Sequence, residues 1–257
     1  MTDARRVPGR FVWCDLMATD PEAARRFYGA LFPVWQLGAR DEPEAGFQRI
    51  SLSGRTIGSF VDLNPAYGLP SHWVPYLTVR SVDEACAHAK ELGGKVHSPP
   101  MEMAGLGRFA VLGDPQGAVF SPIEPAEETP EHNGPMPAGA FCWLELLTTD
   151  AASAAAFYAK VLGWSHAEVP MGGAPYHLFR RGERDAAGMV QMPAGAEEKP
   201  GWLAYVYTSD MDASVARVTE LGGRVWRAVA HVPGVGQFAV AADPNGAKVA
   251  LFRSERG

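Results

Sequence analysis

Two short stretches of the sequence, FVWCDLMATD at residues 11–20 and FCWLELLTTD at residues 141–150, each place one carboxylate inside an apolar run. The carboxylates are Asp15 and Glu145, and a tryptophan precedes each of them by two residues. Side chains two residues apart on a strand share a face, so each carboxylate is expected beside an indole ring. Apolar surroundings raise the pKa of a carboxyl group, which suits it to proton transfer as a general acid or base.

The same carboxylates also have a structural interpretation. A carboxylate on a strand can pair with an arginine or accept hydrogen bonds from backbone N–H groups, and for either residue taken alone this is the commoner case. The duplicated placement favours a role in a cleft or at an interface between modules, and it does not separate these two roles.

The two stretches belong to an internal repeat. Trp13 matches Trp143, and after a one-residue deletion Trp73 matches Trp202. ELGGKV and ELGGRV, and then the turns DPQG and DPNG, match in the same order. The repeat divides the chain into two modules.

We place the modules at residues 8–124 and 138–254. The segment between them, residues 125–137, is rich in proline and glutamate and lacks apolar periodicity, so it is expected to be an extended linker. Each module shows the order β-α-β-β-β twice, with the first half abbreviated differently from the second. The expected first-module elements are strands at 11–19, 47–52, 57–63 and 72–79, helices beginning at Pro21 and spanning 81–92, and a hairpin over 107–124.

Composition limits the function classes. The chain has 257 residues, 47% of them apolar, and a net charge of −6, which gives no electrostatic footprint for nucleic acid. No apolar stretch is long enough for a membrane span, and the polar N-terminus is not a secretory signal. Three cysteines without CxxC spacing indicate reduced, buried thiols. We therefore expect a cytoplasmic protein with neither nucleic acid nor membrane as a partner.

The repeated strand line, the ELGG helix end and the DPxG hairpin resemble the vicinal oxygen chelate superfamily, which includes glyoxalase I, bleomycin-resistance proteins and extradiol dioxygenases. In detail the chain is similar to tandem two-module glyoxalase-like proteins of actinobacteria, often labelled hydroxylases or hydrolases. The resemblance covers nearly the whole chain. It implies an α+β fold of paired βαβββ units, whose curved mixed sheets enclose a cleft for a small molecule. One fold hosts many chemistries, so function needs separate evidence.

Metal-using members of that superfamily carry His or Gln on the first strand of a module, His opening the fourth strand and Glu on the last strand. The resemblance maps these three places to residues that are neither His nor Glu. They are Trp13 and Trp143, Val74 and Leu203, and Ser121 and Ala250. We therefore expect no metal site and no cofactor. A divalent metal held by displaced ligands, through His72, Glu124 or His177, is the alternative.

If the ligand positions face the cleft, strand alternation adds further residues to it. The candidate catalytic residues are Asp15, Glu145, His177 as a base and Tyr205 as an orienting group. The candidate substrate-binding residues are Trp13, Trp143, Tyr76, Tyr207, His72 and Gln48. Such a site is a mostly apolar pocket with a few polar groups, as in many small-molecule sites.

We favour a metal-independent enzyme that acts by acid–base chemistry, as an isomerase, hydrolase or lyase would, on a small hydrophobic or aromatic metabolite. The first alternative is a non-catalytic protein that binds and sequesters a drug or metabolite. The second is a divalent-metal glyoxalase or dioxygenase with displaced ligands. The expected partner is a small molecule, and two questions stay open: whether the chain is a homodimer, and whether clefts form within one chain or between chains.

Overall fold

The computed structural model describes residues 7–38, 47–127, 134–171 and 174–255. The first module contains β1 (Phe11–Ala18), α1 (Pro21–Leu31), β2 (Gln36–Leu37), β3 (Phe47–Leu52), β4 (Arg55–Asp62), η2 (Pro65–Tyr67), β5 (His72–Thr78), α2 (Val82–Glu91), β6 (Lys95–Met103), β7 (Gly107–Gly113) and β8 (Val119–Pro125). The second contains β9 (Phe141–Thr148), α3 (Ala151–Leu162), β10 (Ser165–Met171), β11 (Ala174–Arg181), β12 (Arg184–Gln191), β13 (Gly201–Tyr207), α4 (Met211–Glu220), β14 (Arg224–Val232), β15 (Gly236–Ala242) and β16 (Lys248–Ser254).

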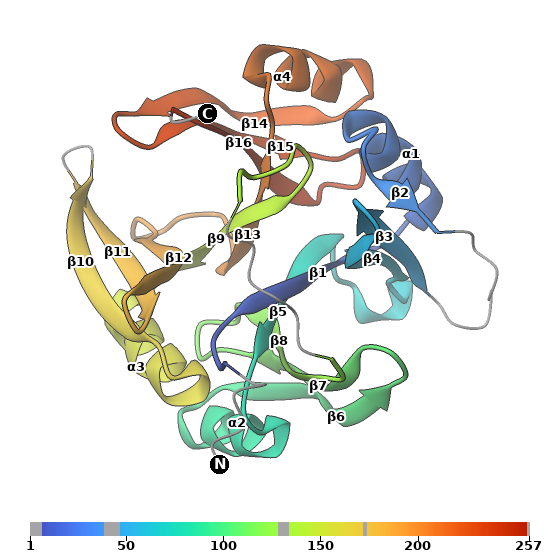
Figure 1. Cartoon of the computed structure of the whole chain (residues 1–257). Helices are drawn as coiled ribbons and strands as arrows, with labels where there is room; N and C mark the ends of the chain where they lie inside the picture. Colours follow the sequence, from blue (N-terminus) through green and yellow to red (C-terminus); the bar gives the residue numbers. More distant parts are fainter. Residues whose placement is uncertain (1–6, 39–46, 128–133, 172–173, 256–257) are drawn as a thin grey trace. The chain divides into compact units, whose positions relative to one another are not determined.

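The strands form two eight-stranded mixed sheets, one for each module (Figure 1). The strand order is β2-β3-β4-β1-β5-β8-β7-β6 in the first sheet and β10-β11-β12-β9-β13-β16-β15-β14 in the second. In both, the first strand of a βαβββ unit pairs in parallel with the last, and the other pairs within a unit are antiparallel. The α+β fold of paired βαβββ units is therefore confirmed.

Four strands that we did not locate individually from the sequence, β2, β6, β10 and β14, are the outermost strands of the two sheets. Every described side chain on them is exposed or half-buried, so they lack the alternation of apolar residues that marks an inner strand. β6 also carries Pro99 and Pro100, which an edge strand tolerates because one side of it makes no ladder hydrogen bonds.

The helix ends follow the predicted chemistry. Asp20 and Asp150 cap α1 and α3, accepting from the backbone N–H of Ala23 at 2.9 Å and of Ser153 at 3.0 Å. Gly93 follows α2 with a φ of +81°, in the left-handed region that glycine adopts readily. No helix in the described ranges is long and apolar enough to cross a membrane.

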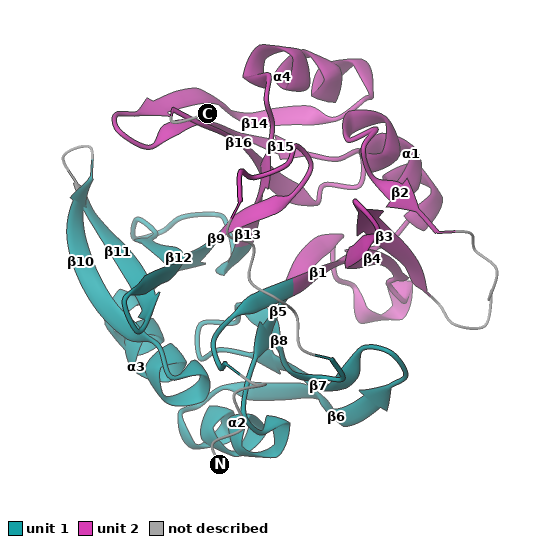
Figure 2. Ribbon diagram, in the orientation of Figure 1, with its two compact units in different colours: residues 1–12, 75–131, 144–202 teal, residues 13–74, 132–143, 203–257 magenta. Residues whose placement is uncertain are grey.

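Packing divides the chain differently from the repeat (Figure 2). Unit 1 holds residues 1–12, 75–131 and 144–202, and unit 2 holds residues 13–74, 132–143 and 203–257. Each compact unit thus combines half of one module with half of the other, whereas each sheet follows a single module.

The predicted linker, residues 125–137, overlaps a strand at its start because β8 runs to Pro125. Its residues 128–133 lie outside the described ranges. The module boundaries stay predictions.

In unit 1 a buried Trp–Tyr–Asp series connects the two modules. Trp202 Nε1 donates to Tyr158 Oη at 3.1 Å, and Tyr158 Oη donates to Asp114 Oδ2 at 3.0 Å. Asp114 belongs to the DPQG turn of the first module, whereas the other two residues lie on β13 and α3 of the second. Asp114 Oδ1 accepts from the backbone N–H groups of Gln116, Gly117 and Ala118. Tyr158 therefore supplies Asp114 with a buried donor from the other module.

Unit 2 contains the counterpart series with the modules exchanged. Trp73 Nε1 of the first module donates to Tyr28 Oη at 3.2 Å. Burial, and then the nearby Asp243 of the second module's DPNG turn, raise the pKa of Tyr28 well above its ordinary value. Oδ1 of Asp243 accepts from the N–H groups of Asn245 and Ala247 at 2.8 and 2.9 Å. The same three residue types therefore meet between the modules in both units, but within the described residues Asp243 Oδ2 accepts no hydrogen bond, so in unit 2 the contact between Tyr28 and Asp243 is electrostatic.

A second reciprocal contact joins the modules through tryptophan and glycine. In unit 1 Trp164 Nε1 donates to the carbonyl of Gly9 at 2.7 Å, and in unit 2 Trp35 Nε1 donates to the carbonyl of Gly139 at 2.7 Å. Gly9 has a φ of +74°, and a Cβ there would lie 2.3 Å from Trp164 Nε1. The indole therefore packs against bare backbone, which only glycine allows.

Replacing Tyr158 with phenylalanine should lower the free energy of unfolding by about 1–3 kcal/mol, because it leaves buried polar atoms of Trp202 and Asp114 without this partner. Urea unfolding followed by fluorescence measures the change. Tyr67→Phe is the control, since Tyr67 is 69% exposed, and it should change stability by less than about 0.5 kcal/mol. Equal effects of the two substitutions would contradict the role given to Tyr158.

The pH dependence of stability should report the buried aspartates. Burial raises the pKa of Asp114 and of Asp243, outweighing the hydrogen bonds that lower it. A carboxyl group with a raised folded-state pKa stabilises the fold most at pH values below its unfolded pKa of about 3.9, and this contribution is lost as the pH rises through the folded pKa.

Asp114→Asn cannot ionise at this position, so the wild-type stability minus that of the variant should fall as the pH rises from about 4 to about 7. Urea unfolding at a series of pH values tests this. A difference that stays constant, or that grows with pH, would show that Asp114 does not titrate as its burial implies.

Candidate functional site

The first strand of each module presents its carboxylate on the face opposite the buried core. On β1 the residues flanking Asp15, Cys14 and Leu16, are both 0% exposed. On β9 the flanking residues Leu144 and Leu146 are likewise buried, whereas Glu145 is half-buried. The strands therefore turn both carboxylates away from the helix-covered core.

Asp15 is held by two side chains of the first module and is 5% exposed. Trp13 Nε1 donates to its Oδ1, and Ser59 Oγ donates to the same oxygen at 2.5 Å. Ser59 lies directly opposite Asp15 in the parallel pair of β1 and β4. A carboxylate with two neutral donors and little solvent access is suited to hold its neighbours in place.

Glu145 has a different environment in unit 1. Tyr176 Oη, on β11, donates to Glu145 Oε1 at 2.8 Å. The residue opposite Glu145 on the intervening strand β12 is Gly188, which has no side chain. Glu145 is thus a half-buried carboxylate oriented by a phenol.

The repeat shows that the hydroxyl donor has changed position between the modules. Ser59, the donor to Asp15, corresponds to Gly188, and Phe47 corresponds to Tyr176. Tyr176 was not among the predicted site residues. The sequence signal that could have revealed Tyr176 is this pair of differences. The second module lacks the serine hydroxyl beside its carboxylate, and it has a tyrosine hydroxyl on a nearby strand instead.

His177 and Gln48, which the sequence analysis placed on the carboxylate face, lie on the opposite face of their strands. Phe179, two residues after His177, is 0% exposed, and its ring centre lies 5.5 Å from that of Tyr158 on α3. The His177 ring instead contacts His166, with 2.9 Å between Nδ1 of His177 and Nε2 of His166. The expectation that His177 faces the same side as Glu145 is therefore corrected, and its role as a base stays a prediction.

Gln48 is the counterpart of His177 and is buried in the first module. It lies opposite Phe60, whose ring packs against Tyr28, and its Nε2 donates to the carbonyl of Gly38. Alternation of apolar and polar residues shows that a strand has two different faces, but it does not show which face a helix covers. For this reason Gln48 and His177 were both assigned to the wrong face.

His72 is half-buried at the start of β5 in unit 2. Its Nδ1 lies 2.8 Å from the carbonyl oxygen of Pro70. Because a carbonyl only accepts, Nδ1 carries the proton and Nε2 is left as an acceptor. Burial lowers the pKa of His72, so this residue is neutral at pH 7.

Trp143, Tyr205 and Tyr207 belong to an aromatic surface of unit 2. We call this surface, which also includes Phe238 and Phe252, the platform. Leu203, Tyr205, Val240 and Ala250 form a buried cluster, and Cys142, Trp143, Phe238 and Phe252 pack against it half-buried. Burial raises the pKa of the Cys142 thiol to about 12, so it is inert at neutral pH. Tyr207 lies opposite Phe252 in the pair of β13 and β16.

Arg227 borders the platform, its Cζ lying 4.9 Å from the centre of the Phe238 ring. Arg227, Phe238 and Phe252 were not among the predicted site residues. Their alternation along β14, β15 and β16 could have suggested them, had β14 been located.

Tyr76 lies on the corresponding surface of the first module, in unit 1. Its ring centre is 5.5 Å from that of Phe109, and it lies opposite Ser121. Tyr76, Phe109 and Ser121 are 5%, 5% and 0% exposed. The side chains of this surface are buried, whereas several rings of the platform are only half-buried.

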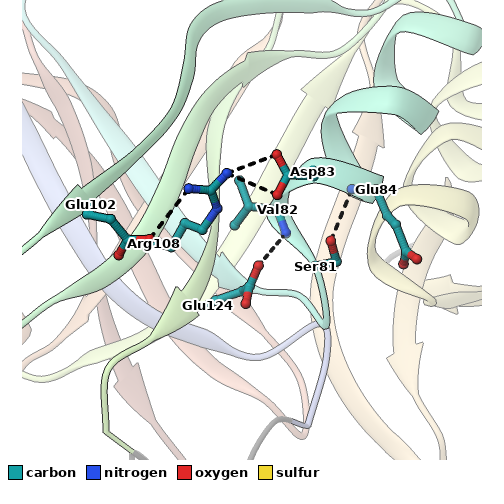
Figure 3. A network of polar contacts seen from close by, with 7 residues as sticks. All are labelled: Ser81, Val82, Asp83, Glu84, Glu102, Arg108 and Glu124. Atoms are coloured by element: carbon teal, nitrogen blue, oxygen red, sulfur yellow. Dashed lines mark hydrogen bonds and ion pairs between the residues drawn. The ribbon is translucent and has the colours of Figure 1, made fainter.

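Glu124, one of the displaced-ligand candidates, is part of a polar network at the start of α2 (Figure 3). Its Oε1 accepts from the backbone N–H of Val82 at 2.8 Å, and Arg108 nearby binds Asp83 and Glu102. Among the residues with described positions, no three His, Cys, Asp or Glu side chains form a group that could hold a metal ion.

Comparison with known proteins supports the fold. Residues 10–121 match the Glyoxalase/Bleomycin resistance protein/Dioxygenase superfamily, and residues 143–252 match a Glyoxalase-like domain. The chain is 31% identical over 255 residues to "Putative glyoxylase CFP32" of Mycobacterium tuberculosis, covering 94% of this chain and 93% of that protein. It is 30% identical over 271 residues to "Anthracycline biosynthesis protein DnrV" of Streptomyces peucetius, covering 98% and 96%.

Solved structures share the fold. The Mn(II)-bound glyoxalase from Novosphingobium aromaticivorans has a TM-score of 0.66 at 16% identity, with 96% of this chain and 82% of that chain covered. The 2,3-dioxygenase LapB from Pseudomonas sp. KL28 has a TM-score of 0.65 at 13% identity, with 96% and 93% covered. Two matched halves, full-length relatives and a shared fold show that this chain is a tandem two-module member of the glyoxalase/bleomycin resistance protein/dioxygenase superfamily.

Proposed function

We propose that this protein is an enzyme that transfers protons, without a metal ion, on a small aromatic metabolite, with Glu145 as the base. The observation that carries the proposal is the half-buried Glu145 carboxylate, which accepts a hydrogen bond from Tyr176 at 2.8 Å. A general base needs a fixed orientation and partial access to its substrate, and this pair supplies both.

The chemistry that suits the pair is proton removal from a carbon next to a carbonyl group. Glu145 takes the proton, and the bond electrons move to the carbonyl oxygen as an enolate. The Tyr176 hydroxyl can change from donor to acceptor when Glu145 becomes protonated, so the pair stays bonded in both states. Return of the same proton to another atom completes an isomerisation with no other reactant.

Asp15 has a positioning role in this proposal. It is almost fully buried, and both Trp13 and Ser59 donate to one of its oxygens. In this proposal Asp15 holds the Trp13 indole and strand β4 in a fixed arrangement.

Metal independence is part of the proposal and is supported by the chemistry of the side chains. The positions where metal-using relatives carry ligands hold tryptophan, valine, leucine, serine and alanine here, which lack an imidazole or carboxylate donor. The aromatic residues of the platform, and the names of the Streptomyces relatives, support an aromatic ligand. We also infer a cytoplasmic protein from the free cysteines. The net charge of −6 favours a partner other than nucleic acid.

Binding without turnover is the competing function, and the half-exposed aromatic rings of the platform favour it as much as they favour catalysis. A sequestering protein would use the same rings and would leave its ligand unchanged. Turnover therefore separates the two functions.

Wild-type protein in D₂O should accelerate deuterium incorporation into aromatic ketones, beginning with 2-tetralone, at the carbon next to the carbonyl. Glu145→Gln should reduce this acceleration by about 10²- to 10⁴-fold, because the amide cannot accept the proton. Nuclear magnetic resonance or mass spectrometry follows the exchange, and dialysis against EDTA should leave the rate unchanged.

Glu183→Gln is the matched control, since Glu183 is exposed in the turn between β11 and β12, and it should retain the wild-type rate. Tyr176→Phe should give an intermediate loss. Ketone binding without any exchange above background would support sequestration instead, and loss of the rate with EDTA would support the metal alternative.

The two carboxylates should differ in their effect on stability. Asp15→Asn weakens two buried hydrogen bonds and should lower the free energy of unfolding by about 1–3 kcal/mol. Glu145→Gln, at a half-buried position, should lower it by less than about 1 kcal/mol. Urea unfolding of both variants measures this order, and the reverse order would overturn the division of roles.

A further inference from the structure

The platform of unit 2 is built from two rows of side chains on one face of the second sheet. In the first row Arg227 lies opposite Val240, Val240 opposite Ala250, and Ala250 opposite Tyr205. In the second row Phe238 lies opposite Phe252, and Phe252 opposite Tyr207. Residues directly opposite each other in neighbouring strands share a face, so a cation and aromatic rings occupy the same surface.

The rings of this surface retain accessible area. Trp143, Tyr207, Phe238 and Phe252 are half-buried, above a buried floor that includes Val240 and Ala250. Aromatic rings that are held at their base and exposed on one side offer stacking area to a flat ligand.

Arg227 adds a charge to that surface. Its guanidinium lies over the Phe238 ring, with 4.9 Å from Cζ to the ring centre. No carboxylate within the described ranges forms an ion pair with it, and no acceptor there bonds to its N–H groups. A guanidinium stacked by its face on a ring keeps its N–H edge available, which fits the two oxygens of a carboxylate.

The corresponding surface of the first module lacks these features. Ser98 replaces Arg227, Ile123 replaces Phe252 and Thr78 replaces Tyr207. Thr78 and Ile123 are 2% and 1% exposed, and Thr78 Oγ1 donates to the carbonyl of Val7 at 2.6 Å. At the positions of Arg227, Tyr207, Phe238 and Phe252 the first module therefore has neither a cation nor an accessible ring, whereas Trp13, the counterpart of Trp143, is half-buried as Trp143 is.

We propose that the platform binds one planar aromatic anion per chain, with Arg227 pairing with the ligand's carboxylate or phenolate and the rings of Phe238, Phe252 and Tyr207 stacking against it. This inference rests on the proposed function in taking an aromatic metabolite as the ligand. It adds the ligand's charge, its place on the second module and the stoichiometry.

Calorimetric titration with 2-naphthoate and with 2-naphthamide, a neutral molecule of the same shape, tests the proposal on the full chain. Naphthoate should bind with a stoichiometry of one and about 10-fold more tightly than naphthamide. Arg227→Gln should weaken naphthoate binding by about 10- to 100-fold and leave naphthamide within about 2-fold, because only the charge pairing is removed.

Arg224→Gln is the matched control. Arg224 lies on the same strand and also stacks on an aromatic ring, but that ring is Trp226, with 4.9 Å from Cζ to the ring centre. This variant should bind both probes like the wild type. Phe252→Ile, which introduces the first-module residue, should weaken both probes equally, since it removes stacking area without changing charge.

The proposal fails if the wild type binds naphthoate no more tightly than naphthamide, if neither probe binds, if two molecules bind per chain, or if Arg227→Gln and Arg224→Gln behave alike. Failure of the proposed function looks different. Charge-selective binding that depends on Arg227, with no deuterium exchange into ketones, would leave this inference standing and remove the proton-transfer role of Glu145. Exchange that depends on Glu145, with naphthoate binding that ignores Arg227, would do the reverse.

Discussion

The buried Trp–Tyr–Asp series is the interaction on which the rest of the fold depends. Tyr158 in unit 1 is 0% exposed and connects an indole of its own module to a carboxylate of the other, with 3.1 and 3.0 Å between the bonded atoms. A buried carboxylate or indole N–H without a partner is strongly unfavourable, so the series requires both modules to be present and in register. Unit 2 has the counterpart residues: the Trp73–Tyr28 hydrogen bond lies within the first module, and Asp243 of the second module acts on Tyr28 through its charge.

This reciprocal core leaves the opposite faces of the sheets free to diverge. In the first module Asp15 is closed in by Trp13 and Ser59, whereas in the second the donor to Glu145 is Tyr176 on another strand. The core residues keep their types between the repeats because their volumes and hydrogen bonds are shared across modules, and the face residues do not carry that constraint. One fold can therefore hold a structural carboxylate in one half and a carboxylate suited to chemistry in the other.

The platform extends the same divergence from the carboxylates to the binding surface. Tyr207, Phe238, Phe252 and Arg227 have smaller, buried or uncharged counterparts in the first module. Duplication supplies two equivalent surfaces at first, and only one of them needs to be kept open for a ligand. The closed surface then contributes packing, as Tyr76 and Phe109 do through their ring contact at 5.5 Å.

The sequence by itself determined the repeat, the α+β fold and the two carboxylates beside tryptophans, because strand periodicity, helix caps and turn residues are local signals. It did not determine the edge strands, whose exposed side chains carry no such pattern, nor the faces on which Gln48 and His177 lie. The tertiary structure alone decided that Tyr176 reaches Glu145 and that Arg227 lies over Phe238. The first contact joins strands that are not consecutive in the sequence, and the second depends on the shifted register of the β14–β15 hairpin. Packing of the whole sheet sets both registers.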